Sequence, residues 1–304
     1  MIVSHALSGA CALTEIIQMA DSRALLGRPV ARNINEATSD KSIAFAAKAG
    51  RRPKLAVLAS SDPSSQSYLK TIRSTAKNVN CDTLEIPVES AWDLGTVIKA
   101  LDSLNKDESV DGILVQEPLP SKINLDRIGI VIDPRKDIDG ISPEQSGRLF
   151  RNHKSAMAPP TARACIEILD FYRYGLQGLE VVVLGRSLVV GKPAGILALS
   201  RNATVTWCHS KTHALPAICK RAEILIVAVG RARMVDETFI RPGATVIDVG
   251  INIDENGKLC GDVDSDRIRS IATAYTPVPG GIGPVTTACL FDNLVRAAGY
   301  RIKI

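Results

Sequence analysis

The stretch Glu180-Val181-Val182-Val183-Leu184-Gly185-Arg186-Ser187-Leu188-Val189-Val190-Gly191-Lys192-Pro193 decides the fold class of this chain. Its first five residues are mostly β-branched and predict a buried strand, and a helix is predicted over 193–200. The glycine-containing turn between them offers backbone N–H groups and a helix N-terminus, which can hold an anionic phosphate. The turn lacks the G-x-G-x-x-G spacing, so alone it is also compatible with a plain connection between two elements.

Strands and helices alternate on both sides of this turn. Apolar runs predict further strands at 54–59, 81–88, 112–115, 203–207, 224–229 and 245–249. Helical spacing recurs at 5–20, 43–46, 65–78, 91–105, 161–172 and 286–298. The alternation predicts an α/β protein with parallel sheets and helices on both faces. A domain boundary is expected between Phe150 and Pro160, because Pro159-Pro160 interrupts the pattern there.

Composition narrows the class of protein. A length of 304 residues fits two domains or one large one, and a net charge of +5 fits an anionic small ligand rather than nucleic acid. Aromatic residues make up 4%, too few for a base-stacking surface. No apolar run is long enough to span a membrane, and the amino terminus lacks the basic start of a signal peptide, so a cytoplasmic protein is expected. The seven cysteines are scattered without a Cys-x-x-Cys pair, which predicts reduced thiols and no metal site.

The end of the second strand after the glycine turn indicates which dinucleotide binds. A site that prefers NAD usually has an acidic residue there to bind the ribose 2′-hydroxyl. Here Trp207-Cys208 is followed by His209-Ser210-Lys211-Thr212, without a carboxylate. Arg186, Ser210 and Lys211 could instead surround a 2′-phosphate with charge-assisted donors. The sequence therefore favours NADP over NAD, and Cys208-His209 is interpreted as strand-end packing.

Six separated segments carry distinctive motifs: DGILVQEPLP at 111–120, KDIDG at 136–140, GRSLVVGKP at 185–193, ATVTWCHSKT at 203–212, PGATVIDVGIN at 242–252 and TPVPGGIGPVT at 276–286. Together they resemble the methylenetetrahydrofolate dehydrogenase/methenyltetrahydrofolate cyclohydrolase family, from about Leu26 to the C-terminus. The resemblance implies two α/β domains with a cleft between them. It assigns 1–155, completed by a C-terminal helix at 286–304, to the folate side, and 156–285 to a Rossmann-like NADP-binding domain. It also implies a homodimer.

The resemblance further implies two reactions and the residues that serve them. The dehydrogenase step moves a hydride from 5,10-methylenetetrahydrofolate to the nicotinamide, and the cyclohydrolase step adds water to the methenyl product. Tyr68 would orient the folate ring, Gln116 would partner a catalytic lysine, and Asp139 would recognise the pterin. The other positions that match are Pro279, Gly280 and Gly281 for substrate, and Gly185, Arg186, Ser187, Ser210, Ile251 and Thr286 for cofactor. Taken alone, Asp139 also fits an Asx-turn and Tyr68 ordinary helix packing.

Ile72 is the main departure from the family pattern. It occupies the lysine position, four residues after Tyr68, so the two side chains share one face of the predicted 65–78 helix. Isoleucine can neither carry a proton nor donate a hydrogen bond. Lys70 and Arg73 lie elsewhere around the helix and cannot replace the lysine. The sequence therefore predicts a dehydrogenase whose cyclohydrolase activity is lost or strongly reduced.

Glu117 is a second departure, and it leaves other functions open. It adds a carboxylate beside the folate site, where the family usually has an apolar residue. Glu117 or a bound water could take over the proton work, which would keep both activities. Other readings are a folate- or NADP-binding protein without catalysis, and a dehydrogenase for a one-carbon carrier with a different ring.

Overall fold

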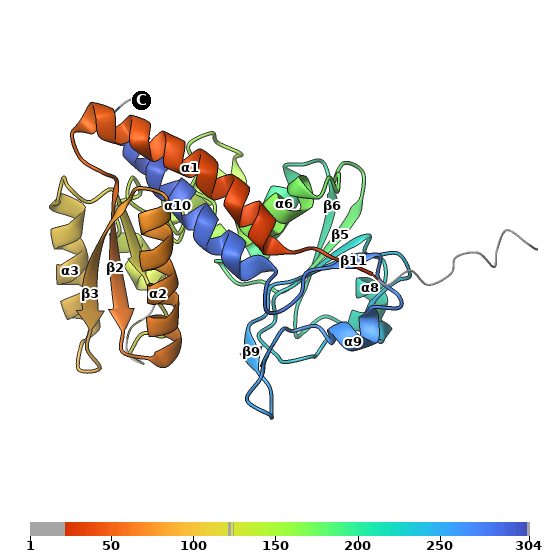
Figure 1. Ribbon diagram of the computed structural model, residues 1–304. Coiled ribbons are helices and arrows are strands. Elements are labelled where there is room, and N and C mark those ends of the chain that lie inside the picture. Colours follow the sequence, from red (N-terminus) through yellow and green to blue (C-terminus); the bar gives the residue numbers. More distant parts are fainter. Residues whose placement is uncertain (1–21, 121–122, 124, 303–304) are drawn as a thin grey trace, which may run out of the picture.

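The computed structural model describes residues 22–120, 123 and 125–302, which form two α/β lobes (Figure 1). Two long helices, α1 (Gly27–Ala49) and α10 (Ile282–Arg301), lie side by side and run from one lobe to the other. The prediction of two α/β domains with parallel sheets is confirmed. The helix predicted at 5–20 lies outside the described residues.

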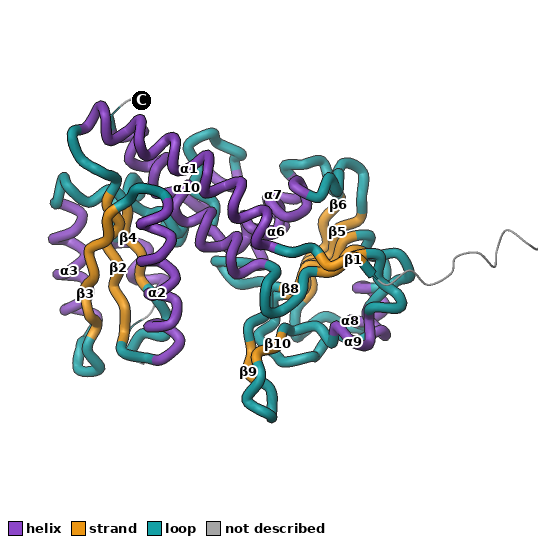
Figure 2. The backbone as a smooth tube through the Cα atoms, viewed as in Figure 1, coloured by secondary structure: helices purple, strands orange, loops and turns teal. Residues whose placement is uncertain are grey.

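The first lobe is built on a three-stranded parallel sheet in the order β3-β2-β4, seen at the left of Figure 2. Its strands are β2 (Lys54–Ser60), β3 (Asp82–Val88) and β4 (Gly112–Val115). Its helices are α2 (Pro63–Asn78), α3 (Leu94–Lys106), α4 (Leu125–Val131) and α5 (Pro143–Phe150). Alternate residues of β2 enter two different cores: one lies under α2 and α10, the other under α3 and α4. Helices therefore cover both faces.

Local capping explains where the helix that carries Tyr68 begins. Asp62 is its N-cap, and the carboxylate accepts a hydrogen bond from the Ser64 N–H at 2.8 Å. Pro63 is the first helical residue, where the missing N–H is not needed. The helix thus starts two residues before the predicted Ser65, and this fixes the rotation of the following turns.

The second lobe contains a six-stranded sheet in the order β1-β11-β8-β7-β5-β6, in which every neighbouring pair is parallel. Its strands are β1 (Arg23–Ala24), β5 (Glu180–Leu184), β6 (Thr204–Cys208), β7 (Ile224–Val227), β8 (Thr245–Asp248) and β11 (Ala274–Tyr275). A hairpin of β9 (Asn252–Ile253) and β10 (Leu259–Cys260) projects from this lobe (Figure 1). Its helices are α6 (Pro160–Phe171), α7 (Gly191–Leu199), α8 (Leu215–Cys219), α9 (Ser265–Ile268) and the 3₁₀ helix η1 (Glu237–Phe239).

Two boundaries differ from the sequence expectation. Arg23–Ala24 was expected in the folate-side domain, but it pairs with β11 as the edge strand of the second sheet. The chain therefore starts its described part in one lobe and crosses to the other through α1. The C-terminal helix begins at Ile282 rather than Thr286, directly after Gly281, so Thr286 lies inside its first turns.

Close backbone packing and buried charges fix α1 against α10. The Gly27 N–H donates to the Gly280 carbonyl at 2.8 Å, and a Cβ on Gly27 would lie 1.8 Å from the Gly281 oxygen. Only glycine permits this approach. Further along, Asp292 accepts from Lys41 at 2.8 Å and from Arg163 at 2.7 Å, which joins α1, α6 and α10. These contacts set how the two lobes face each other.

Candidate functional site

The folate-side residues gather at the carboxyl ends of β2 and β4. Tyr68 on α2 lies close to Thr287 of α10 and to Asp139. Burial raises the pKa of the Tyr68 hydroxyl, the Asp139 charge raises it further, and the Thr287 contact opposes the change. Tyr68 is therefore a neutral hydrogen-bonding group across the physiological pH range.

Asp139 faces two other carboxylates. Burial raises its pKa to about 7, and the negative charges of Asp137 and Glu117 add to the effect. Asp137 itself is held by the backbone N–H of Ser142 at 2.7 Å and that of Ile141 at 3.2 Å. The structure thus places Tyr68, Asp139 and Glu117 in one cluster, in which Asp139 changes its charge near neutral pH.

Gln116 holds a hydrogen-bond donor without a partner. The residue is 4% exposed, and its Oε1 accepts from the Ser65 hydroxyl at 2.7 Å. Its Nε2 has no hydrogen-bond partner among the described residues. A buried donor left unpaired costs about 1–3 kcal/mol, so a group of this kind is expected to face a ligand.

Ile72 lies fully buried, one turn beyond Tyr68 on α2. It belongs to the apolar core formed with Leu55, Leu114 and Phe291. The neighbouring cations do not take its place: Arg73 forms an ion pair with Glu85 on β3, and Lys70 is exposed. No cation of α2 reaches the position where the family pattern has lysine.

A glycine loop of the second lobe leads into α10. Pro279 and Gly280 are exposed, and Gly280 has a φ of 106°, a conformation that favours glycine. A Cβ on Gly281 would lie 2.7 Å from the Pro277 oxygen. The loop leads directly into α10, where Thr286 is half-buried and donates to the Ile282 carbonyl at 3.3 Å. The exposed Gly280 leaves the backbone of this loop open to close approach.

The glycine turn after β5 forms a tight cradle. Gly185 has a φ of +139°, and a Cβ there would lie 2.3 Å from the Ala228 oxygen. A Cβ on Gly191 would lie 2.4 Å from the Gly185 carbonyl. The Ser187 hydroxyl accepts from the Gly191 N–H at 3.3 Å and fixes the turn. These contacts leave the backbone open to a phosphate, so the residues present fit a bound dinucleotide.

The 2′-phosphate candidates come together at the same sheet edge. β5 and β6 pair in parallel with Leu184 opposite Cys208, and the Gly185 N–H donates to the Cys208 carbonyl at 2.9 Å. Arg186, Ser210 and Lys211 are therefore brought near each other, and all three are exposed. Within the described part of the chain, neither Arg186 nor Lys211 forms an ion pair. Both cations are available to an anion.

Ile251 lies on a loop organised by a residue that sequence reasoning missed. Asp262 is fully buried and accepts from the backbone N–H groups of Val229 at 2.6 Å and Arg231 at 2.8 Å, and from the Asn252 amide at 2.9 Å. It joins the loops that follow β7 and β8, and Ile251 stands 70% exposed beside it. Ser65 and Thr287 were missed too. Ser65 could have been predicted from the sequence, because it lies one turn before Tyr68 on the same helix. Thr287 lies beside Tyr68 only through tertiary packing.

The described residues show no sign of a metal site or of a membrane-spanning helix. No group of three or more potential metal ligands occurs among those residues. The six cysteines that the structure describes are free and buried. No described helix is both long and apolar enough to cross a membrane.

The fold and the site together define a two-lobed α/β protein of the dinucleotide-binding class. The chain belongs to the tetrahydrofolate dehydrogenase/cyclohydrolase family: the catalytic domain of that family matches residues 25–139, and its NAD(P)-binding domain matches residues 159–302. The predicted family and its nicotinamide-dinucleotide cofactor are thereby confirmed.

The sequences and structures of similar proteins align with nearly the whole length of this chain. It is 41% identical to the bifunctional protein FolD of Streptococcus thermophilus, over 91% of this chain and 98% of the relative. The identity to FolD of Clostridioides difficile is 43%, over 89% and 94%. Among solved structures, FolD of Campylobacter jejuni has a TM-score of 0.88 at 34% identity, covering 92% and 99%. FolD of Trypanosoma brucei, complexed with NADP cofactor and inhibitor, has a TM-score of 0.88 at 31% identity, covering 94% and 100%.

Proposed function

We propose that this chain is an NADP-dependent methylenetetrahydrofolate dehydrogenase whose cyclohydrolase activity is lost or strongly reduced. The observation that carries the proposal is the pair of Ile72 and Gln116. Ile72 is fully buried in an apolar core, and the Gln116 Nε2 is left without a partner. Family membership and the cradle after β5 support the retained dehydrogenase, and the NADP bound to the T. brucei relative supports the choice of cofactor.

Dehydrogenation depends mainly on how the substrate and the nicotinamide are positioned relative to each other. The bound NADP would supply a nicotinamide ring that accepts a hydride. Tyr68 and Asp139 would hold the reduced pterin from the first lobe, and Gly280 with Gly281 would let it approach from the second. Hydride transfer requires two carbons placed face to face rather than a proton carrier. These residues can meet that requirement without a lysine at position 72.

Hydrolysis of the methenyl product requires proton transfer in addition to correct positioning. Adding water to the methenyl carbon requires a group that takes and returns a proton, and such groups contribute about 10²–10⁴-fold. Tyr68 keeps its proton because burial raises its pKa. Ile72 has no proton to give, and Arg73 is engaged with Glu85. We therefore infer that water addition proceeds near its uncatalysed rate.

A spectrophotometric assay of both half-reactions tests this function. We expect NADPH to form from methylenetetrahydrofolate, and methenyltetrahydrofolate to be hydrolysed no faster with enzyme than without it. Hydrolysis well above the uncatalysed rate would contradict the proposal. Absence of NADPH formation would favour a binding protein without catalysis, or a carrier with a different ring.

Glu117 gives a specific reason to keep a bifunctional enzyme as the second candidate. Its exposed side chain follows Gln116 directly, and its charge acts on Asp139. If Glu117 had taken over the proton work, the Glu117→Gln variant would lose hydrolysis. Under our proposal the same variant leaves the slow hydrolysis unchanged. The methenyl hydrolysis rate of the two proteins decides between these outcomes.

The substrate affinity is expected to depend on pH through Asp139. An ionised carboxylate accepts hydrogen bonds from pterin N–H groups, and a protonated one accepts them poorly. Because the pKa of Asp139 is about 7, kcat/KM for the folate should fall as the pH drops below that value. Asp139→Asn should lower kcat/KM and remove this dependence. Glu117→Gln should move the midpoint to lower pH, because the Glu117 charge raises the Asp139 pKa. A profile that is the same in all three proteins would refute the assignment.

We also propose that the protein acts as a homodimer in the cytoplasm, as the family resemblance implies. Sedimentation equilibrium of the full chain tests the dimer directly. A monomer at micromolar concentration would rule it out.

A further inference from the structure

Two buried carboxylates lie under the loops at one edge of the second sheet. Asp248 is the last residue of β8 and is 4% exposed, and Asp262 follows β10 and is fully buried. The two are linked, because the Asp262 N–H donates to the Asp248 carboxylate at 3.0 Å. Neither forms an ion pair with any residue that the structure describes. Burying two adjacent acids without a cation is unfavourable, which indicates a role beyond packing.

Asp262 fixes the loop that follows β7. Its carboxylate accepts hydrogen bonds at 2.6, 3.0 and 2.8 Å from three successive backbone N–H groups, those of Val229, Gly230 and Arg231. It also accepts at 2.9 Å from the side-chain amide of Asn252, the residue after Ile251. One carboxylate therefore ties the loop after β7 to the loop after β8.

Asp248 fixes the other side of Ile251. Its carboxylate accepts from the Gly250 N–H at 2.9 Å, and a Cβ on Gly250 would lie 2.4 Å from the Asp262 Cγ. The residue before Ile251 is thus held by Asp248, and the residue after it by Asp262. Ile251 itself is 70% exposed. The two carboxylates hold its backbone in place while its surface stays accessible.

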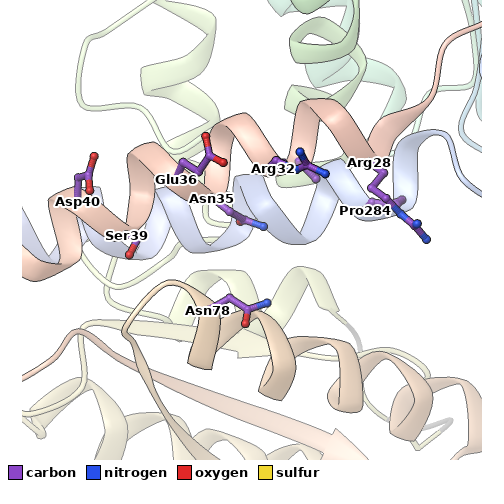
Figure 3. Close-up of a pocket in the computed structure, with 9 residues that line it drawn as sticks. Arg28, Arg32, Asn35, Glu36, Ser39, Asp40, Asn78 and Pro284 are labelled. Carbon is purple, nitrogen blue, oxygen red and sulfur yellow. The ribbon is translucent and has the colours of Figure 1, made fainter.

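The backbone of Asp248 also contacts the loop that follows β11. The Asp248 N–H donates to the Thr276 hydroxyl at 2.7 Å, and that hydroxyl donates to the Asp248 carbonyl at 3.2 Å. Thr276 begins the glycine loop that leads into α10. The far end of this loop is bonded to the start of α1, and Figure 3 shows Arg28 of α1 beside Pro284 of α10. The glycine loop is therefore anchored at both ends.

The strand order indicates which part of a dinucleotide lies over these loops. Strands β6, β5, β7, β8 and β11 are neighbours in that order and all parallel, so the loops at their carboxyl ends line one edge. The 2′-phosphate candidates follow β6, and the glycine cradle follows β5. Neighbouring strands lie about 4.8 Å apart. A dinucleotide seated on the cradle would therefore extend its nicotinamide half over the ends of β7 and β8, next to the glycine loop.

We propose that Asp248 and Asp262 are positioning residues for hydride transfer, which hold the loop at Ile251 and the loop at Thr276 in a fixed relation to each other. This inference rests on the proposed dehydrogenase function and adds two residues to it. In that step a hydride leaves the methylene carbon, which becomes the methenyl cation, and NADP is reduced to NADPH. The two carboxylates act through N–H groups of the loops, and so set how closely the two reacting carbons meet.

Binding of NADPH to the full chain tests the inference without turnover. In Asp262→Asn one oxygen becomes an NH₂ group, which has the same size but cannot accept from the backbone N–H groups. We expect the calorimetric Kd for NADPH to stay within about threefold of the wild type, because the contacts at β5 and β6 are unchanged. The fluorescence enhancement of the bound reduced nicotinamide should be mostly lost, because the ring is no longer held. Asp248→Asn should act in the same direction.

Turnover provides the second readout. With methylenetetrahydrofolate, kcat of Asp262→Asn should fall by about 10- to 100-fold, as expected for a small misplacement of the reacting carbons. The isotope effect from substrate deuterated at the methylene carbon should increase, because hydride transfer becomes rate-limiting. All proteins are compared above the pKa of Asp248, which burial raises to about 7, so that this carboxylate is ionised.

Asp236→Asn is the matched control. Asp236 caps η1 in the same lobe, where its carboxylate accepts from the Thr238 N–H at 2.9 Å. Its replacement should change neither the nicotinamide fluorescence nor kcat. If thermal unfolding shows that Asp262→Asn does not fold, Asn252→Ala takes its place, because it removes only the amide contact to Asp262. It should show the same pattern with a smaller loss.

The outcomes separate this inference from the function on which it rests. An unchanged nicotinamide fluorescence in a folded Asp262→Asn protein overturns the inference. A loss of NADPH affinity as large as the loss of kcat overturns it too, because the carboxylate would then support binding as a whole. A wild type that enhances NADPH fluorescence but forms no NADPH from substrate would overturn the proposed dehydrogenase. The fluorescence comparison would still decide the positioning role.

Discussion

Replacing Ile72 with lysine is expected to create cyclohydrolase activity, raising methenyltetrahydrofolate hydrolysis by about 10²–10⁴-fold over the wild type. Helix α2 carries Ser65, Tyr68 and Ile72 at three- and four-residue spacing. The Ser65 hydroxyl donates a hydrogen bond to the Gln116 Oε1. Long helical side chains lean toward the helix N-terminus, so a lysine at 72 would extend toward that glutamine. Burial lowers a lysine pKa. A neutral amine there has one lone pair with which to take a proton from water.

The control for this experiment is Ile72→Met, which has similar length but no proton to exchange. It should leave hydrolysis unchanged and dehydrogenase activity near the wild-type rate. Lysine in an apolar core is destabilising, so thermal unfolding of both variants must be followed with activity. A folded Ile72→Lys enzyme that still oxidises its substrate but hydrolyses nothing would show that more than this side chain has been lost.

The packing of Ile72 explains how the fold tolerates isoleucine where the family pattern has lysine. A lysine at a buried position has to be desolvated and paired, whereas isoleucine packs against Leu55 and Phe291 without either requirement. Part of that gain is offset by the unpaired Gln116 Nε2. The substitution therefore shifts the balance from proton chemistry toward core stability. This is a reason for expecting the Ile72→Lys variant to be active but less stable.

Much of the fold was predictable because its signals are local. The valine-rich run at 180–184 and its glycine turn form a strand and cradle as expected, and Tyr68 and Ile72 share a helix. Arg23–Ala24 escaped prediction because two residues carry no periodicity and the strand exists only through pairing with β11. Thr287 and Asp262 escaped for a related reason, since their partners are distant in the chain.

Arg186→Gln is expected to weaken the binding of NADP but not that of NAD. The KM for NADP should rise by about 10- to 100-fold, because one charge-assisted contact of about 1.5–3 kcal/mol is removed. Arg186 follows the Gly185 turn, is exposed, and forms no ion pair within the described residues. NAD has no 2′-phosphate, so its KM should change little. Lys211→Gln should act in the same direction, because the pairing of β5 with β6 brings Lys211 to the same edge.

Steady-state kinetics with both dinucleotides provides the measurement, and Lys220→Gln provides the matched control. Lys220 is an exposed cation of the second lobe that follows α8. Its replacement changes the net charge equally but should leave the ratio of kcat/KM for NADP and NAD unaltered. If Arg186→Gln lowered kcat/KM for both dinucleotides by the same factor, Arg186 would contact the shared part of the cofactor. Recognition of the 2′-phosphate would then be assigned to Ser210 and Lys211, the other two candidate donors at this sheet edge.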